Sequence, residues 1–371
     1  MKKKLAIVVL GGAIGAIVLG FLLLEHDRPK PLPLANGTEL ASTTRSEEKV
    51  SHRFPPHVRP GETPGAKPTT NLLTRIANGE ELTPLTPEQV AGYLEANHRS
   101  IDSLLGAYRT TRDKALLKEA AEKYPNDPRV ALEAAYFGEP EERWKWLDAF
   151  KNSAPDNSLP SYLSAGDYLK AGDKAHALEE MQAAATKSNF QDYFGDFVHN
   201  ATEAYRAAGC SEAEAKSAAA SQALLPYLAS LKQLGVGLVD MAQSYGKAGD
   251  TASAQTALDM AVKLGAKLNQ PDAQTLIGML VGIAVQKNAL QAFDPNGPYG
   301  PSGQSVQSAL DALNQQREEI KALAKPLEDD VLARLPEADL INYRDRQLLF
   351  GAQAALEWLK TKYKPVGAAG Q

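Results

Sequence analysis

The feature of this chain that most constrains its fold is a segment that occurs more than once. Residues 165–184 and residues 242–261 lie 77 positions apart and share nine identical residues. The identical pairs are Ala165/Ala242, Tyr168/Tyr245, Lys170/Lys247, Ala171/Ala248, Gly172/Gly249, Asp173/Asp250, Ala175/Ala252, Ala177/Ala254 and Ala184/Ala261. A third copy lies between them, offset by 37 from the first and by 40 from the last, and contains Tyr205, Ala208, Gly209 and Ser211. Such self-similarity predicts that like units stack on one another to build a continuous core.

Each copy predicts two antiparallel helices joined by a tight turn. We expect Gly172 to end the first helix, because glycine adopts the left-handed conformation of a helix C-terminus without a steric penalty. Asp173 then caps the second helix, and Ser211 with Glu214 forms a capping box at the same place in the middle copy. Small residues such as Ala177 let the two helices of a pair approach closely.

The order of small residue, Tyr, Gly, Ala, large apolar residue and Ala resembles that of the tetratricopeptide repeat. Its positions here are Ala165, Tyr168, Gly172, Ala177, Ala184, Tyr205, Gly209, Ala242, Tyr245, Gly249, Ala254 and Ala261. The resemblance covers residues 158–266, and a weaker copy begins at Leu105. The signature tryptophan is missing, Arg112 replaces the turn glycine of the weaker copy, and the periods exceed the roughly 34 residues usual in the family. The resemblance implies an all-α, TPR-like α-α superhelical solenoid over residues 85–268.

The first 24 residues predict a membrane anchor. Lysines at positions 2–4 precede Leu5–Leu24, an uncharged run long enough to cross the roughly 30 Å hydrocarbon layer. The lysines predict a single pass through the inner (cytoplasmic) membrane, with the N-terminus in the cytoplasm and the body periplasmic or extracellular. A cleaved signal peptide is the alternative, but no small-x-small cleavage site follows the run. Gly11 and Gly15 would suit a homodimer of this helix, although glycine is common in membrane helices.

Residues 25–84 predict a proline-rich, disordered linker. Positions 29–70 hold eight prolines among polar residues and show no apolar periodicity. Such a segment buries too little apolar surface to offset its ordering entropy. We therefore expect a semi-extended tether between the anchor and the body.

Residues 269–371 predict a further helical region. Leu276–Val285 is uncharged and apolar but too short to cross a bilayer, so we expect a buried helix. A Pro/Gly loop with Tyr299 at its centre follows, and then helices with a break at Pro326. We expect these C-terminal helices to cap the open end of the repeats.

Composition and motifs argue against several kinds of function. The first 70 residues carry a net charge of +4 while the whole chain carries −5, so the body is acidic and does not suit nucleic acid. The sequence contains no HExxH, GxSxG, P-loop or dinucleotide-binding motif, and we predict no enzymatic activity, no metal and no cofactor. Cys210, the only cysteine, precedes a helix whose dipole would lower the pKa of the thiol, but no catalytic partner is evident.

Four cations suggest a binding groove. Each follows the tyrosine of its copy by one or two residues, near the end of the first helix: Arg109, Lys170, Arg206 and Lys247. In a stacked array they would form a ladder suited to an acidic peptide; alternatively, each cation only complements a helix dipole. Trp144 and Trp146 point to nearly opposite sides of one helix, so we expect one in the core and one at a contact, and we assign Trp146 to the groove.

The leading hypothesis is a membrane-anchored, non-enzymatic scaffold or adaptor that binds a protein or peptide through a helical-repeat groove. The first alternative is an enzyme or ligand-binding protein whose site lies in the C-terminal helical region around Tyr299. The second alternative is a structural spacer that assembles with itself. Because repeat folds have many partners, the sequence leaves this choice open.

Overall fold

The computed structural model describes residues 76, 82, 84–300, 303–328 and 331–363. Within these ranges nearly all regular structure is helical, which confirms the predicted all-α class. The run Leu5–Leu24, the Gly11/Gly15 motif and most of the proline-rich segment lie outside the described residues. No helix in the described part of the chain is long and apolar enough to cross a membrane.

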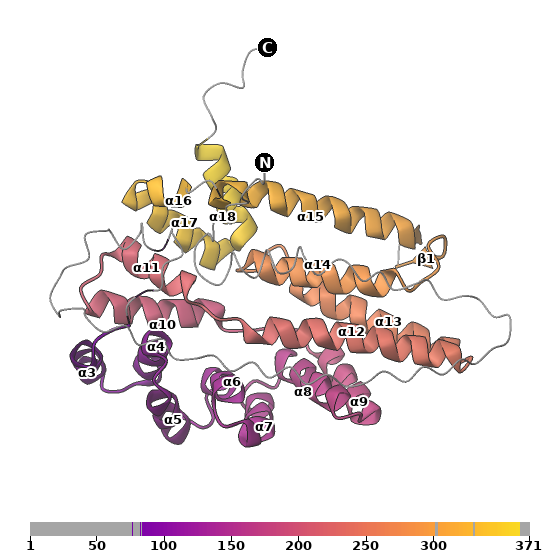
Figure 1. Ribbon diagram of the computed structural model, residues 1–371, viewed down its shortest axis with the longest axis horizontal. Helices are drawn as coiled ribbons and strands as arrows, with labels where there is room; N and C mark the ends of the chain where they lie inside the picture. Colours follow the sequence, from indigo (N-terminus) through magenta and orange to yellow (C-terminus); the bar gives the residue numbers. More distant parts are fainter. Residues whose placement is uncertain (1–75, 77–81, 83, 301–302, 329–330, 364–371) are drawn as a thin grey trace, which may run out of the picture.

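The helices are arranged in three tiers, which Figure 1 shows from bottom to top. The lower tier is a row of short helices: α3 (Pro87–Ala96), α4 (Ile101–Thr111), α5 (Lys114–Lys123), α6 (Pro128–Phe137), the 3-10 turn Pro140–Glu142, α7 (Arg143–Ser153), α8 (Leu159–Lys170) and α9 (Lys174–Thr186). The middle tier holds α10 (Phe194–Ala207) and α12 (Pro226–Lys247). The upper tier holds α11 (Glu212–Ser221), α13 (Thr251–Leu268), α14 (Leu276–Leu290), α15 (Val306–Glu328), α16 (Val331–Arg334), α17 (Glu337–Phe350) and α18 (Ala352–Lys362).

The chain folds back between the lower and middle tiers. Helix α10 packs along α4, and α12 packs along α8. The contact between α10 and α4 depends on Gly106, because a Cβ at this position would collide with the backbone carbonyl of Asn200. The groove that we expected along the first helices of the repeats is therefore occupied at α4 and α8 by the chain's own middle tier.

The turns of the three strong repeat copies have one geometry. Gly172, Gly209 and Gly249 adopt left-handed φ angles of 81°, 95° and 80°. In each turn the amide after the glycine donates to the carbonyl of the repeat tyrosine, over 2.9 Å to Tyr168, 3.1 Å to Tyr205 and 3.0 Å to Tyr245. This is the hydrogen bond of the Schellman motif that ends a helix. The predicted helical hairpins are confirmed in all three copies.

The weaker copy ends its first helix without a glycine and with a different hydrogen bond. Arg112 takes the left-handed conformation with φ 60°, and its own amide donates to the carbonyl of Tyr108 over 2.7 Å. The next amide, that of Asp113, donates to the hydroxyl of Thr111 over 3.2 Å instead, and the carboxylate of Asp113 caps α5 by accepting from the amide of Ala115. The departure from the repeat pattern at position 112 therefore changes both the residue and the hydrogen bonding of the turn.

Capping residues set the starts of several helices. Thr86 with Gln89 and Ser211 with Glu214 both form complete capping boxes, as the sequence predicts. Asp173 and Asp250 cap α9 and α13 by accepting from backbone amides three residues on. These bonds satisfy amides that a helix leaves unpaired at its N-terminus.

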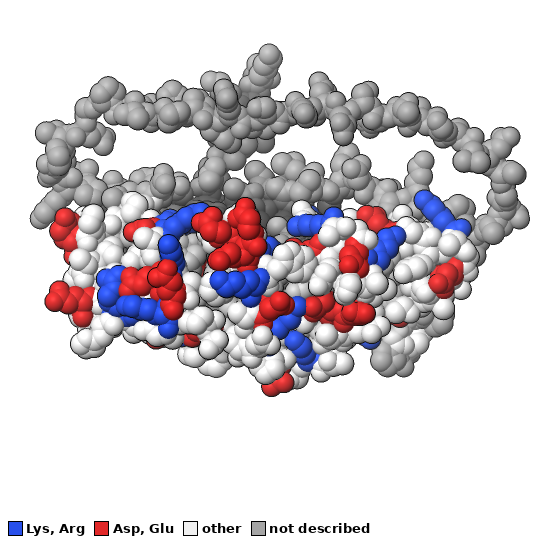
Figure 2. All heavy atoms as spheres, turned by 90° about the horizontal axis from the view of Figure 1, so that it is seen from below, with Lys and Arg blue, Asp and Glu red and all other residues white. Residues whose placement is uncertain are grey.

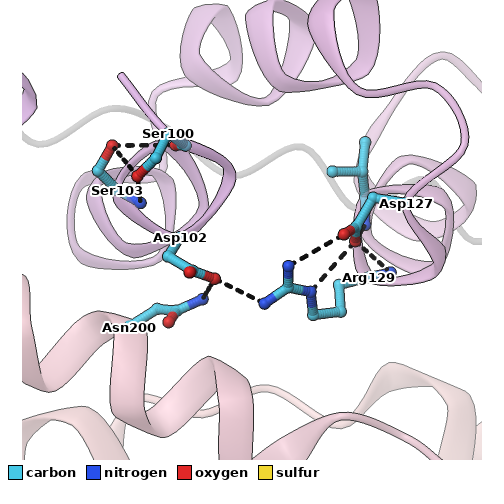
Figure 3. Close-up of polar contacts among 7 residues, drawn as sticks. Ser100, Asp102, Ser103, Asp127, Arg129 and Asn200 are labelled. Atoms are coloured by element: carbon cyan, nitrogen blue, oxygen red, sulfur yellow. Dashed lines mark hydrogen bonds and ion pairs between the residues drawn. The ribbon is translucent and has the colours of Figure 1, made fainter. Parts of the chain in front are cut away.

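A polar cluster joins α4, α6 and α10. The Oδ1 atom of Asp102 accepts from Arg129 over 2.6 Å and from Asn200 over 3.3 Å. Arg129 also pairs with Asp127, the N-cap of α6, over 2.9 Å. Figure 3 shows that Arg129 lies between the two carboxylates. Both carboxylates are partnered, so this cluster fixes the tiers relative to each other.

The C-terminal region differs in part from expectation. Helix α14 is buried, and Gly282 allows close contact, since its Cβ position lies only 2.5 Å from the carbonyl oxygen of Gly265 on α13. Strands β1 (Pro298–Tyr299) and β2 (Gln304–Ser305) pair antiparallel in the Pro/Gly loop, with Tyr299 opposite Gln304. The break that we expected does not occur at Pro326, because α15 continues through this proline to Glu328.

Helices α17 and α18 pack on α11 and α15. Leu356 and Leu359 are almost fully buried there, next to Leu340 and Tyr343. Leu349 is exposed at the end of α17, whereas Gly351 at the turn is buried against the backbone of Asp272. The hairpin thus covers α11 and α15 and packs with its turn on the segment that precedes α14.

Candidate binding surface

Arg109, the first of the four predicted groove cations, lies in the interior. Its guanidinium pairs with Glu133 of α6 and lies 3.9 Å from the ring centroid of Phe197 on α10. Only 6% of the Arg109 side chain and 1% of the Glu133 side chain are exposed. Burial lowers the pKa of Arg109 to about 9, which still leaves the group charged at neutral pH. The prediction that Arg109 lines an open groove is wrong, because α10 covers it.

A second polar pair lies beside Arg109. Tyr227, at the start of α12, donates to the carboxylate of Asp192, which precedes α10. Burial raises the pKa of Asp192 and the pKa of Tyr227. Arg109, Glu133, Asp192 and Tyr227 line one small cavity, so these groups form an internal polar network between the tiers.

The other three predicted cations are exposed at the ends of α8, α10 and α12. Arg206 pairs with Glu203 over 3.3 Å on the same helix. Lys170 and Lys247 have no carboxylate partner among the described residues. The four cations therefore do not form one continuous row, because Arg109 is buried and Arg206 is paired with Glu203.

The two tryptophans of α7 are placed on opposite sides of the helix, as their spacing predicts. Trp146 is only 5% exposed, and its indole Nε1 donates to Glu142 over 3.3 Å. Trp144 is 39% exposed. The assignment of Trp146 to a binding groove is therefore wrong, and Trp144 is the tryptophan available for a contact.

Trp144 belongs to an aromatic row that connects three helices. Its ring centroid lies 4.7 Å from that of Tyr168, at the end of α8. The ring of Tyr168 stacks on His176, in the first turn of α9, with centroids 5.1 Å apart. We call Trp144, Tyr168 and His176 the aromatic row. The shared Tyr–Gly–Asp turn positions two of these rings, because it directs α9 back along α8.

His176 is held in place by the residue that caps its own helix. Asp173 accepts from the backbone amide of His176 over 3.1 Å and from its Nδ1 over 2.6 Å. These hydrogen bonds and the negative charge of Asp173 raise the pKa of His176, and the hydrogen bonds from His176 lower the pKa of Asp173. The imidazole therefore adds positive charge to the aromatic row in mildly acidic solution.

Two lysines lie at the α8–α9 turn, each two residues along the chain from a ring of the aromatic row. Lys170 and Lys174 are exposed and have no carboxylate partner in the described part of the chain. Exposed aromatic rings supply apolar contact area at low entropic cost, and adjacent cations attract carboxylates. Elsewhere on the lower tier, Lys and Arg lie among Asp and Glu, as Figure 2 shows from below. The surface as a whole thus has no single sign of charge.

Cys210, Tyr299 and possible metal ligands are weaker candidates for a functional site. The thiol of Cys210 is half-buried, and this burial raises its pKa, contrary to the expected effect of the helix dipole. Tyr299 packs edge-on against Phe293 with centroids 5.7 Å apart, so the ring stabilises its loop. Within the described residues no group of three His, Cys, Asp or Glu side chains is arranged to hold a metal ion.

Of the residues predicted from the sequence, Lys170 lies two residues after Tyr168, whereas the tryptophan assigned to the groove was Trp146 and not Trp144. The sequence missed the aromatic row because residues 144, 168 and 176 are brought together only by packing of α7 on α8 and α9. Comparisons of the chain with protein-family models, with curated proteins and with solved structures found no match.

Proposed function

We propose that this protein is a membrane-anchored, non-enzymatic scaffold that binds an acidic protein segment through the aromatic row and its flanking lysines. The observation that carries the proposal is the stack of the exposed Trp144, the half-buried Tyr168 and the exposed His176, with two unpaired lysines at the neighbouring α8–α9 turn. Such a surface suits a peptide that carries proline or aromatic side chains together with carboxylates.

The fold we propose for the repeats is a TPR-like solenoid that folds back on itself. The common turn at Gly172, Gly209 and Gly249 supports this assignment. Because α10 and α12 cover α4 and α8, we assign partner binding to the ends of the hairpins and not to a groove along the first helices.

The membrane part of the proposal rests on sequence. Leu5–Leu24 with its preceding lysines would anchor the chain, and residues 25–84 would let the body reach a partner on the far side of the membrane. A pair of anchors could further associate through Gly11 and Gly15.

A binding measurement with synthetic peptides tests the proposed surface. The probes are short peptides that contain proline and tryptophan with several aspartates, and the same peptides with asparagine in place of aspartate. We expect the full chain to bind the acidic set, and Trp144→Ala to weaken binding by roughly tenfold or more, as for an anchor at the centre of an interface.

Lys170→Glu should also weaken binding of the acidic peptides, whereas Lys247→Glu is the matched control. Both lysines follow their repeat tyrosine by two residues and both are exposed, but only the tyrosine before Lys170 belongs to the aromatic row. If Lys170→Glu, Lys247→Glu and Trp144→Ala all bound the acidic peptides with the same affinity, the proposed surface would be contradicted.

A further inference from the structure

The tip of the α17–α18 hairpin exposes two adjacent apolar side chains. Leu349 is 72% exposed and Phe350 is 56% exposed, more than any other large apolar residue that the structure describes. They end α17 just before Gly351, whose φ of 90° turns the chain into α18. A pair of adjacent large apolar side chains that are more than half exposed is costly unless something covers it.

Basic and aromatic side chains continue from this tip along the hairpin. Arg346 precedes Leu349 by three residues, which places the two on one face of α17. The guanidinium of Arg346 lies 5.1 Å from the ring centroid of Trp358 on α18, and the amine of Lys362 lies 5.3 Å from the same ring. The outer side of the hairpin is therefore an apolar tip followed by a cation–aromatic stripe.

The charges of this stripe are not balanced locally. Asp345 pairs with Lys216 of α11 over 2.6 Å, and Asp339 accepts from Lys362 and Tyr363. Arg346 and the exposed Lys360, by contrast, have no carboxylate partner within the described ranges. Arg346 and Lys360 therefore remain available for an external anion, although the exposed Glu357, three residues before Lys360, offsets part of their charge.

We propose that the α17–α18 hairpin lies on a bilayer that contains anionic lipids. Leu349 and Phe350 enter the headgroup region, Trp358 lies at its boundary, and Arg346 and Lys360 meet lipid phosphates. Apolar, aromatic and basic side chains on one face are the composition of interfacial membrane contacts. The inference rests on the proposed anchor, because a tethered body meets the bilayer at high effective concentration.

Docking in this way would orient the whole body. The hairpin belongs to the upper tier, and α7, α8 and α9 belong to the lower tier on the opposite side (Figure 1). With the hairpin on lipid, the aromatic row faces away from the bilayer. The partner surface would then remain open to the aqueous phase.

Quenching of tryptophan by brominated lipids tests the proposal in the full chain reconstituted into vesicles. Trp146 is buried, so Trp144→Phe leaves Trp358 as the tryptophan that lipid can reach, and Trp358→Phe leaves Trp144. In vesicles with brominated phosphatidylglycerol we expect strong quenching of Trp144→Phe and little quenching of Trp358→Phe. Addition of Leu349→Asp with Phe350→Asp to the Trp144→Phe chain should abolish the quenching.

A second variant isolates the electrostatic part. Arg346→Gln with Lys360→Gln should remove any preference for phosphatidylglycerol over phosphatidylcholine vesicles, and neither side chain takes part in the core. Circular dichroism checks that each variant keeps its helix content. Quenching that does not depend on these side chains would overturn the proposal.

Retention of the chain by vesicles after an alkaline wash reports the anchor separately. A retained chain whose Trp358 is not quenched would overturn membrane docking and leave the anchor intact. Cross-links between copies at position 350 without quenching would also overturn it, because the tip would then be a contact between two copies. Quenching of a chain that the wash removes would support docking while contradicting the anchor.

Discussion

The α4–α5 hairpin and the α8–α9 hairpin share a local sequence pattern, but the cation of one is buried and the cation of the other is exposed. In both, a cation follows the repeat tyrosine near the end of the first helix, and an aspartate caps the second helix. Arg109 of the first hairpin is buried against Glu133 and Phe197, whereas Lys170 of the second is exposed at the end of α8. The difference arises from the middle tier, because α10 covers the Arg109 side of α4.

The comparison teaches that a shared local pattern does not fix a residue's role. The local sequence decides where a helix starts and stops, but the neighbour that packs on it decides whether a side chain meets solvent. Arg109 follows its tyrosine by one residue on the side that α10 covers, and it forms a buried ion pair. Lys170 follows its tyrosine by two residues, about 100° further around its helix, and it stays exposed.

The largest expected effect comes from breaking the buried pair. Glu133→Ala should lower the free energy of unfolding by about 3–5 kcal/mol, because it leaves the guanidinium of Arg109 buried without a counter-charge. Lys170→Ala, at the exposed end of α8, should change it by less than about 0.5 kcal/mol. Urea unfolding of the full chain, followed by circular dichroism, measures both. Similar shifts for the two variants would show that Arg109 is not buried as described.

The turn glycines provide the next largest effect. A Cβ at Gly172 or Gly249 would meet no atom within 4 Å, so replacement by alanine tests the backbone alone. We expect Gly172→Ala and Gly249→Ala each to cost about 1 kcal/mol of unfolding free energy, because alanine disfavours left-handed φ angles. Gly92→Ala is the matched control: this glycine also has open space but lies within α3. It should stabilise by about 0.5–1 kcal/mol.

Arg112 sharpens the same comparison, because it holds the left-handed conformation without being glycine. Arg112→Gly should relieve backbone strain of roughly 1 kcal/mol, but it removes the bond from Nη2 to the carbonyl of Gln222, 2.7 Å long. A charged donor contributes about 1.5–3 kcal/mol, so we expect a small net loss of stability. Thermal unfolding would contradict this account if Arg112→Gly were markedly more stable than the parent chain.

The sequence predicts local structure well here, for a physical reason. The capping box at Thr86 and the turn at Gly172 depend only on residues a few positions apart, so one chain segment contains all the information. The contact of Arg109 with Phe197 joins α4 to α10, and nothing in either segment specifies that α10 folds back. From the sequence we could predict that one of Trp144 and Trp146 is exposed and the other buried. Which of the two is exposed depends on which face of α7 packs against its neighbours.

The smallest effect concerns the charge of the aromatic row. Asp173 raises the pKa of His176, so the stabilisation from this pair is fully present below the ordinary pKa of about 6.5 and is lost as the pH rises through the higher pKa of the folded state. Asp173→Asn keeps the N-cap, since asparagine caps helices as well as aspartate, but removes the charge. NMR titration should therefore show the pKa of His176 above about 6.5 in the parent chain and near that value in the variant. When the pH rises through the pKa of His176 in the folded parent chain, the imidazole loses its positive charge. This pH change should therefore weaken binding of acidic peptides to the parent chain more than binding to Asp173→Asn. Identical titration of His176 in both chains would mean that the imidazole does not contact Asp173 in solution, and the aromatic row would then lack its titratable member.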